Sequence, residues 1–208
     1  MSTPERPLTL AHWRRTVAEL YADVRTSTAG DAAAAASRYR AARDRLFADH
    51  PDSPIAPSER SHWRGSTWYP YDPAWRTTGV VELVRSTAFE IPLAADGVIR
   101  CAPVARIHFA IAGETAELSL YWFEGYGGGL WLPFSDATSG ESTYGGGRYL
   151  YDTIKGADLG ASGDRLVLDF NFAYNPSCAY DDRWACPLSP AENSLPFAVK
   201  AGERIPAA

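Results

Sequence analysis

The stretch that decides the fold is R-I-H-F-A-I-A-G-E-T-A-E-L-S-L-Y-W-F, residues 106–123. Apolar side chains alternate with polar or small ones in two runs: Ile107, Phe109 and Ile111, then Leu118, Leu120 and Trp122. Such alternation is typical of a β-strand with one buried face, because successive side chains point to opposite faces. Ala112-Gly113-Glu114 lies between the runs and supplies a turn. The sequence therefore predicts an antiparallel hairpin.

Further strand patterns lie on both sides of this hairpin. They cover residues 79–84, 88–93, 130–134, 148–151, 166–172 and 195–199. Short strands separated by frequent turn signals indicate an antiparallel sandwich or barrel rather than βαβ units. Two runs of three glycines, 127–129 and 145–147, each precede a strand pattern. Because phosphate binding uses a helix N-terminus, we interpret both runs as hairpin turns and bulges.

The N-terminal part of the chain predicts a helical hairpin. Apolar residues recur every three or four positions over residues 9–26, and Asp31 could cap a second helix that ends at Asp49. We expect a helical arm over residues 1–57 packed on an antiparallel β domain over 58–208, together one globular unit. The fold class is then mainly β with N-terminal helices (α+β), with a β-barrel or rolled sandwich. Residues 58–77 are too aromatic for a solvated loop, so we expect them to lie over the core.

Composition excludes several classes of partner. The net charge is −5 and the pI about 5.4, which argues against a nucleic-acid phosphate backbone as partner. No apolar run approaches the roughly 20 residues that span a bilayer, and Met1–Pro7 lacks the apolar core of a signal peptide. We therefore expect a cytoplasmic protein without a nucleic-acid or membrane partner. Three cysteines, an odd number, do not make a disulfide framework.

Polar residues concentrate between the strands of residues 134–203. A functional site, or a satisfied buried network, needs such residues in apolar surroundings. The candidate catalytic groups are the carboxylates of Asp136, Glu141 and Asp169, because carboxyls of differing pKa perform acid–base chemistry. Arg148 is a candidate for binding an anionic group. In the alternative, structural interpretation, Arg148 pairs with Asp169, while Asp136 and Glu192 accept backbone hydrogen bonds in turns.

Several further side chains could orient a substrate through hydrogen bonds. They are Thr143, Tyr144, Asn171, Tyr174, Asn175, Glu192 and Asn193, with His62 from the aromatic segment. Cys178 and Cys186 could be structural thiols, a loop-closing disulfide, metal ligands or a reactive thiol. A zinc site needs about four ligands in close pairs, and the sequence does not supply them near the cysteines. We expect neither a metal nor an organic cofactor.

Three motifs resemble one family. They are F-x-D-x-T-S-G-x-x-T-Y-G-G-G-R-Y-L (134–150), L-D-F-N-x-A-Y-N-P-x-C-A-Y (168–180) and C-P-L-x-P-x-E-N-x-L-x-x-x-V-x-A-G-E (186–203). With W-Y-P-Y-D-P-A-W-R at 68–76, they resemble the bacterial and archaeal family DUF1684. The resemblance is specific in 134–203 and weak before residue 60. It implies a shared architecture and a shared polar cluster, and it carries no reaction or catalytic assignment.

Three functions fit these observations. The first is a small-molecule enzyme, hydrolase-like and without an organic cofactor, in which a carboxylate and an arginine act on a small substrate. The second is a non-catalytic barrel whose aromatic residues line a ligand pocket. The third is an interaction domain whose helical arm binds another protein. An enzyme predicts a carboxylate of perturbed pKa in a wet cleft, whereas a binding barrel predicts an enclosed apolar cavity with few titrating groups.

Overall fold

The computed structural model describes residues 6–27, 29–93 and 97–206. In these ranges two α-helices, α1 (Arg6–Thr26) and α2 (Ala32–Asp49), form the predicted hairpin. Tyr21 of α1 is buried, as the apolar periodicity of residues 9–26 predicts, and Tyr39 and Phe47 of α2 are buried as well. Asp31 holds the N-cap position of α2, yet its side chain caps no described N–H group. The predicted N-cap position is thus confirmed, but the capping hydrogen bond does not form, because Asp31 ends a 3-10 turn and keeps helical backbone angles.

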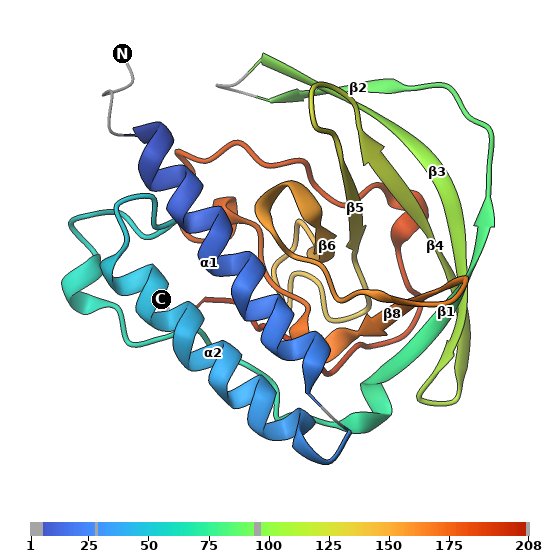
Figure 1. Cartoon of the computed structure of the whole chain (residues 1–208), viewed down its shortest axis with the longest axis horizontal. Helices are drawn as coiled ribbons and strands as arrows, with labels where there is room; N and C mark the ends of the chain where they lie inside the picture. The colour runs from blue at the N-terminus through green and yellow to red at the C-terminus, as the bar shows by residue number, and fades with distance from the viewer. Residues whose placement is uncertain (1–5, 28, 94–96, 207–208) are drawn as a thin grey trace.

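The strands of the described ranges form one antiparallel sheet of eight. They are β1 (Arg76–Leu83), β2 (Phe89–Leu93), β3 (Gly97–Ile111), β4 (Glu114–Phe123), β5 (Gly129–Phe134), β6 (Arg148–Asp152), β7 (Ala161–Ser162) and β8 (Arg165–Asp169). Their order is β6-β5-β4-β3-β1-β8-β7, and β2 also pairs with β3. The β3–β4 pair is the predicted hairpin. The sheet curls into a half-barrel (Figure 1), so the expected α+β, mainly β class is confirmed.

Two predicted strands differ from the structure. The strand expected over 166–172 ends at Asp169, because the Asp169 side chain accepts the N–H of Asn171 and turns the chain into the 3-10 helix Phe170–Phe172. The segment 195–199 is not a strand. Pro196 cannot donate to a ladder, and the N–H of Val199 is bound instead by the carboxylate of Asp136, at 3.2 Å.

The helices and the sheet bury one shared core. Tyr21 and Tyr39 of the helices belong to the same apolar cluster as Ile107, Leu118 and Leu168 of the sheet. The helices lie on the open side of the half-barrel, and the C-terminal segment runs between helices and sheet (Figure 1). This arrangement brings the C-terminal motifs into contact with both layers.

The aromatic segment before β1 lies over the core, as expected. The Tyr69 N–H donates to the carbonyl of Gly202 at 3.0 Å, and the Arg204 N–H donates to Thr67 at 2.8 Å. Trp68 packs edge-on against Tyr39, with 6.0 Å between ring centroids. The segment is thus fixed between α2 and the end of the chain.

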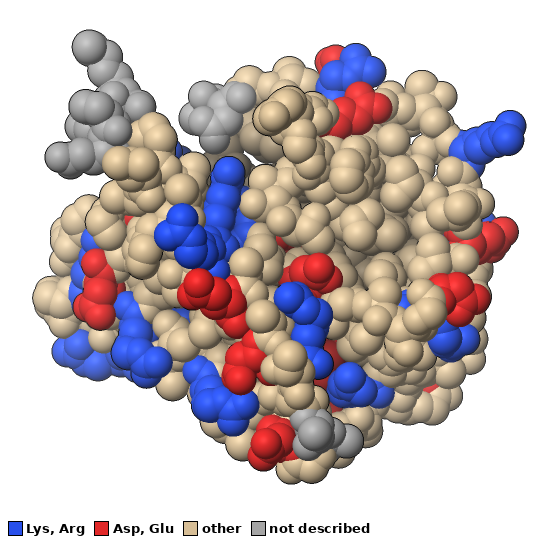
Figure 2. Space-filling model, in the orientation of Figure 1, with Lys and Arg blue, Asp and Glu red and all other residues tan. Residues whose placement is uncertain are grey.

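Charges are mixed on the surface seen in Figure 2. Lys and Arg side chains alternate with Asp and Glu over the helices, and charges of both signs also lie along the edge of the view where the curved sheet runs, with a largely uncharged region between. A phosphate-backbone partner would require a continuous basic surface, and this face does not offer one. None of the helices in the described ranges is long and apolar enough to cross a membrane.

Candidate functional site

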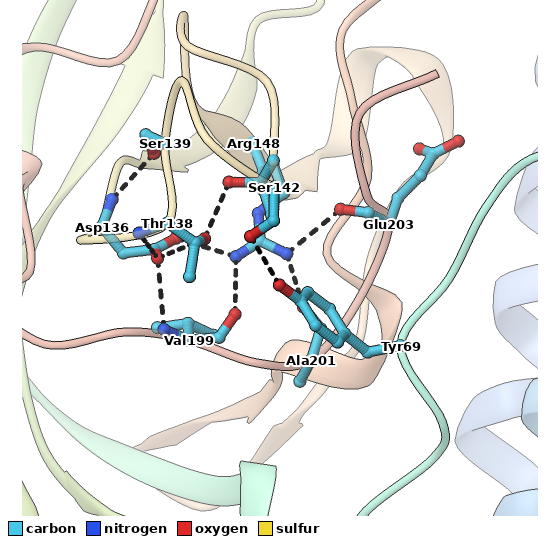
Figure 3. A network of polar contacts seen from close by, with 10 residues as sticks. Tyr69, Asp136, Thr138, Ser139, Ser142, Arg148, Val199, Ala201 and Glu203 are labelled. Atoms are coloured by element: carbon cyan, nitrogen blue, oxygen red, sulfur yellow. Dashed lines mark hydrogen bonds and ion pairs between the residues drawn. The ribbon is translucent and has the colours of Figure 1, made fainter. Parts of the chain in front are cut away.

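Asp136 and Arg148 form a buried ion pair at the end of the sheet, with 2.8 Å between Oδ2 and Nη2. The guanidinium also donates to three carbonyl oxygens of the C-terminal segment: Val199 at 3.1 Å, Glu203 at 3.2 Å, and Ala201. Figure 3 shows these contacts converging on Arg148. We call this set the Asp136–Arg148 network. It fixes residues 199–203 against the sheet.

The network is structural in its geometry. The side chain of Arg148 is 1% exposed and that of Asp136 is 0% exposed, so no substrate can reach either. Burial lowers the pKa of Arg148, and the neighbouring Asp136 carboxylate opposes that effect. The expected pairing of Arg148 with Asp169 is wrong, because Arg148 pairs with Asp136 and Asp169 faces Arg76. Arg148 is therefore not available as an anion-binding residue.

The turn between β5 and β6 extends this network. The Thr138 hydroxyl donates to Asp136 at 2.6 Å and shares a hydrogen bond of 2.8 Å with the Thr143 hydroxyl. Thr143 is fully buried, so it supports the turn rather than a substrate. Glu141 lies on the same turn but is exposed to solvent. The structure does not bring it into a cluster with the buried carboxylates.

A second buried network surrounds Glu203. Its Oε2 accepts from Arg43 Nη2 at 3.0 Å and from the Asn175 N–H at 2.7 Å, and the Tyr180 hydroxyl donates to Oε1. The Arg43 guanidinium also lies over the ring of Tyr174, 5.2 Å from its centroid. Tyr174 and Asn175 line a cavity of about 50 Å³ beneath the helices. This cavity has room for only a few water molecules.

Asn193 and Glu192 lie on the 3-10 helix Ala191–Asn193, which is hydrogen-bonded to the sheet. Asn193 accepts the N–H of Ser119 at 2.8 Å and donates to the carbonyls of Ser119 and Pro133 at 2.9 and 2.7 Å. It thus joins β4 to β5 as a backbone amide would. Glu192, which is exposed, accepts the hydroxyl of Tyr121 at 2.7 Å. The structure places neither residue beside Asp169.

Asp169 ends β8 at the wall of a pocket. Its Oδ1 accepts from the N–H and the side-chain amide of Asn171, at 3.1 and 2.9 Å. Asn171 in turn exchanges two hydrogen bonds with the backbone of Asp72, at 2.9 and 2.8 Å. Arg76 is the register partner of Asp169 in the β1–β8 pair, and its Nε lies 3.4 Å from Asp169 Oδ2. Two of the sequence candidates, Asp169 and Asn171, are thus joined here.

The pocket has a volume of about 140 Å³ and lies between the helices and β8. Asp169 and Arg76 line it from the sheet, and Arg25 and Ala35 line it from the helices. Arg40 of α2 lies close enough to Asp169 for each charge to affect the pKa of the other. Its Nε and Nη2 atoms are buried and have no hydrogen-bond partner among the described residues. Arginine side chains from both layers therefore surround one carboxylate.

Burial dominates the electrostatics of this pocket. Burial raises the pKa of Asp169. The hydrogen bonds from Asn171 and the charges of Arg76 and Arg40 act in the opposite direction, but their effect is smaller. Burial also lowers the pKa of Arg40. The pKa of Tyr71 is raised by burial and by the nearby Asp169 carboxylate. A carboxyl group of raised pKa beside arginines can exchange a proton with an anionic molecule that the arginines bind.

The remaining candidates lie elsewhere. Tyr144 donates from its hydroxyl to Cys178 Sγ at 3.5 Å, and Cys178 and Cys186 are free thiols. His62 is 74% exposed and lies 3.9 Å from Glu59, so the structure gives it no pocket. Within the described ranges, no group of three or more His, Cys, Asp or Glu residues could hold a metal ion.

A family model described as a protein of unknown function, DUF1684, matches residues 61–204. The chain belongs to the DUF1684 family. The match spans most of the aromatic segment, the whole sheet and the three sequence motifs at 134–150, 168–180 and 186–203. These motifs supply most residues of the Asp136–Arg148 and Glu203 networks.

A solved structure supports the same assignment. The DUF1684 chain is similar to the solution NMR structure of an uncharacterized protein from Haloarcula marismortui, with 36% sequence identity and a TM-score of 0.59. The likeness covers 81% of this chain and 91% of that one. A search of the curated proteins gave no match.

Sequence reasoning missed the arginines of the pocket and the Glu203 network. In this DUF1684 protein Arg25, Arg40 and Arg43 come from helices that precede the family-model match. In the sequence these arginines occupy polar positions of amphipathic helices, and nothing in the local pattern distinguishes them from solvent-exposed side chains. Arg76 had one available signal, since it closes the W-Y-P-Y-D-P-A-W-R segment, but its place opposite Asp169 depends on strand pairing.

Proposed function

We propose that this protein is a small-molecule enzyme, hydrolase-like and without an organic cofactor, that acts on an anionic substrate in the Asp169 pocket. The observation that carries the proposal is a buried carboxyl of raised pKa, Asp169, in a pocket walled by arginines. Guanidinium groups bind carboxylates and phosphates with well-directed hydrogen bonds. Arg76 takes the anion-binding role, and Asp169 donates or accepts the proton.

Hydrogen-bonding atoms that are not fully satisfied in the pocket favour the binding of an anion. Asp169 Oδ1 accepts two hydrogen bonds from Asn171. Among the described residues, Oδ2 has one charged partner, Arg76 Nε at 3.4 Å, which is beyond ideal hydrogen-bond length. Arg25 and Arg76 line the pocket from its two layers. An anion that bound between them would lie beside Asp169 Oδ2 and accept hydrogen bonds from both guanidinium groups. The nearby Arg40 charge would favour such an anion without contacting it.

A non-catalytic binding barrel is the second candidate, and one observation weighs against it. That function requires an enclosed apolar cavity large enough for a ligand. The aromatic cavity beneath the helices holds only about 50 Å³, whereas the Asp169 pocket holds about 140 Å³ and contains titratable groups. Of these two spaces the larger one thus contains the titratable groups, while the apolar grooves of about 560 and 620 Å³ elsewhere on the molecule are open to solvent rather than enclosed.

Binding is tested first, by thermal shift with inorganic phosphate, acetate and short dicarboxylates. We expect at least one anion to raise the melting temperature of the wild type, and Arg76→Gln to abolish the rise. Arg76 is half exposed, so this substitution leaves the fold intact. Arg106→Gln is the matched control, since Arg106 pairs with Glu117 on the surface at 3.7 Å. Equal shifts in both variants would contradict the proposed anion site.

Catalysis is tested next, with esters and amides of the anion that binds. Asp169→Asn keeps an oxygen for the two hydrogen bonds from Asn171 but replaces Oδ2 with an amide NH2 group, so the side chain can no longer ionise or transfer a proton. We expect this variant to retain anion binding. Its turnover should fall about 100-fold or more, because general acid–base catalysis typically contributes a rate factor of that size. Unchanged turnover in a folded Asp169→Asn protein would exclude the enzyme role of this carboxyl.

A further inference from the structure

Cys178 and Cys186 are adjacent thiols, separate from the Asp169 pocket and from both buried networks. The N–H of Cys178 donates to Cys186 Sγ at 3.4 Å, and the Tyr144 hydroxyl donates to Cys178 Sγ at 3.5 Å. Both thiols are partly exposed, whereas Cys101 is buried. Seven residues separate them in the chain. The fold therefore brings two accessible sulfur atoms together.

The two thiols lie in a groove of about 560 Å³ that opens to solvent. Phe89 and Ile91 of β2 form one side of it, and Trp184 and Leu188 belong to the loop that carries the cysteines. In Figure 1 this loop, drawn in orange-red, crosses between α1 and β2. Apolar and aromatic walls suit an organic group that contains few charges.

The loop between the cysteines is fixed at several points. The Tyr180 hydroxyl donates to Glu203. Arg183 Nη2 donates to the carbonyl of Ser53 at 3.0 Å, and Trp184 Nε1 donates to that of Pro54 at 3.2 Å. These contacts tie the loop to the C-terminal segment and to the chain after α2. The thiols thus remain close without a covalent bond.

The surroundings make the two thiols unequal. The hydrogen bond from the Cys186 thiol lowers the pKa of Cys178 to about 6, assisted by the Tyr144 hydroxyl and the Lys155 charge and opposed by burial. The same hydrogen bond and burial raise the pKa of Cys186. One sulfur is thus a thiolate near neutral pH and the other a protonated thiol. Attacking and resolving cysteines differ in this way.

We propose that Cys178 and Cys186 form a thiol–disulfide exchange site for low-molecular-weight disulfides with apolar substituents. The Cys178 thiolate attacks one sulfur of R–S–S–R, which forms a Cys178–S–S–R bond and releases RS⁻. Cys186 then loses its proton to solvent and attacks the Cys178 sulfur, which releases the second RS⁻. In sum, two protein thiols are oxidised to one disulfide, and R–S–S–R is reduced to two RSH after protonation.

The test uses 2,2′-dithiodipyridine, a neutral aromatic disulfide, with the folded full-length protein. We expect a fast phase that releases two thiopyridone molecules per chain and leaves the protein about 2 Da lighter, as one disulfide requires. The rate should rise with pH around a midpoint near the Cys178 pKa of about 6. At pH 6 it should exceed that of the thiols of the unfolded chain about 20-fold, after allowance for the lower nucleophilicity of an acidic thiolate.

Three variants assign the steps. Cys178→Ser should lose the fast phase, and Cys186→Ser should release one thiopyridone and keep a mixed disulfide. Cys101→Ala should behave as the wild type, because Cys101 is buried away from the groove. A fast phase that survives Cys178→Ser would overturn the proposal. So would a wild-type protein that stops at the mixed disulfide, or thiols that react no faster than those of the unfolded chain.

Discussion

Arg148 illustrates how one side chain joins distant parts of the molecule. It donates to Asp136 and to the carbonyl groups of Val199 and Glu203 in a site closed to solvent. Arg148→Met keeps much of the volume but leaves the Asp136 carboxylate buried and unpaired. Loss of one partner of a buried pair costs about 3–5 kcal/mol. We expect a decrease of that size in the free energy of unfolding, measured by urea denaturation.

The matched control at the same scale is Arg106→Met. Arg106 and Glu117 form a surface pair at 3.7 Å in which both side chains are about half exposed. Such pairs contribute about 0–1 kcal/mol, so the variant should unfold close to the wild type. Equal midpoints for the two variants would show that the Asp136–Arg148 pair does not stabilise the fold.

At the scale of the element, β1 depends on a residue without a side chain. A Cβ atom at Gly79 would lie 2.2 Å from Ile107 Cγ2 of β3 and 3.1 Å from Leu168 Cδ1 of β8. Because β1 pairs with both strands, neither neighbour can withdraw without disturbing the sheet. Gly79→Ala should lower the free energy of unfolding by about 1–3 kcal/mol, as overpacked cores do.

Gly145 supplies the comparison for that element. A Cβ atom there meets nothing closer than 3.6 Å, and the backbone is not in the left-handed region. Gly145→Ala should therefore be neutral, or stabilise by about 0.4–1 kcal/mol through the unfolded chain. Thermal unfolding of the two variants side by side checks both expectations. An unchanged stability of Gly79→Ala would mean that Ile107 and Leu168 can move away from the new methyl group without cost.

On the scale of the whole molecule, the helical hairpin and the half-barrel form one core. Deletion of residues 1–50 would remove Tyr21, Tyr39 and Phe47 from that core and leave the Glu203 carboxylate without Arg43. We expect the truncated chain to lose its cooperative unfolding transition, as followed by near-UV circular dichroism. A truncated chain that unfolds like the full-length protein would instead support a helical arm that is free to bind a partner.

The sequence by itself determined the helices and most strands, because their signals are periodic and local. The 106–123 hairpin and the 9–26 helix follow from side chains that alternate with the period of the element. It also marked Asp169 and Asn171 as polar residues inside a core strand. It failed at 166–172 and 195–199, where the Asp169 and Asp136 carboxylates capture backbone N–H groups from the ladder.

Only the tertiary structure decided which polar residues meet. Arg148 pairs with Asp136 rather than Asp169, and Arg40 lies near Asp169 although its helix is more than a hundred residues away in the chain. Such pairings depend on strand order and on how the helices dock. Those are set by the summed burial of many apolar side chains, and no local pattern in the chain encodes them.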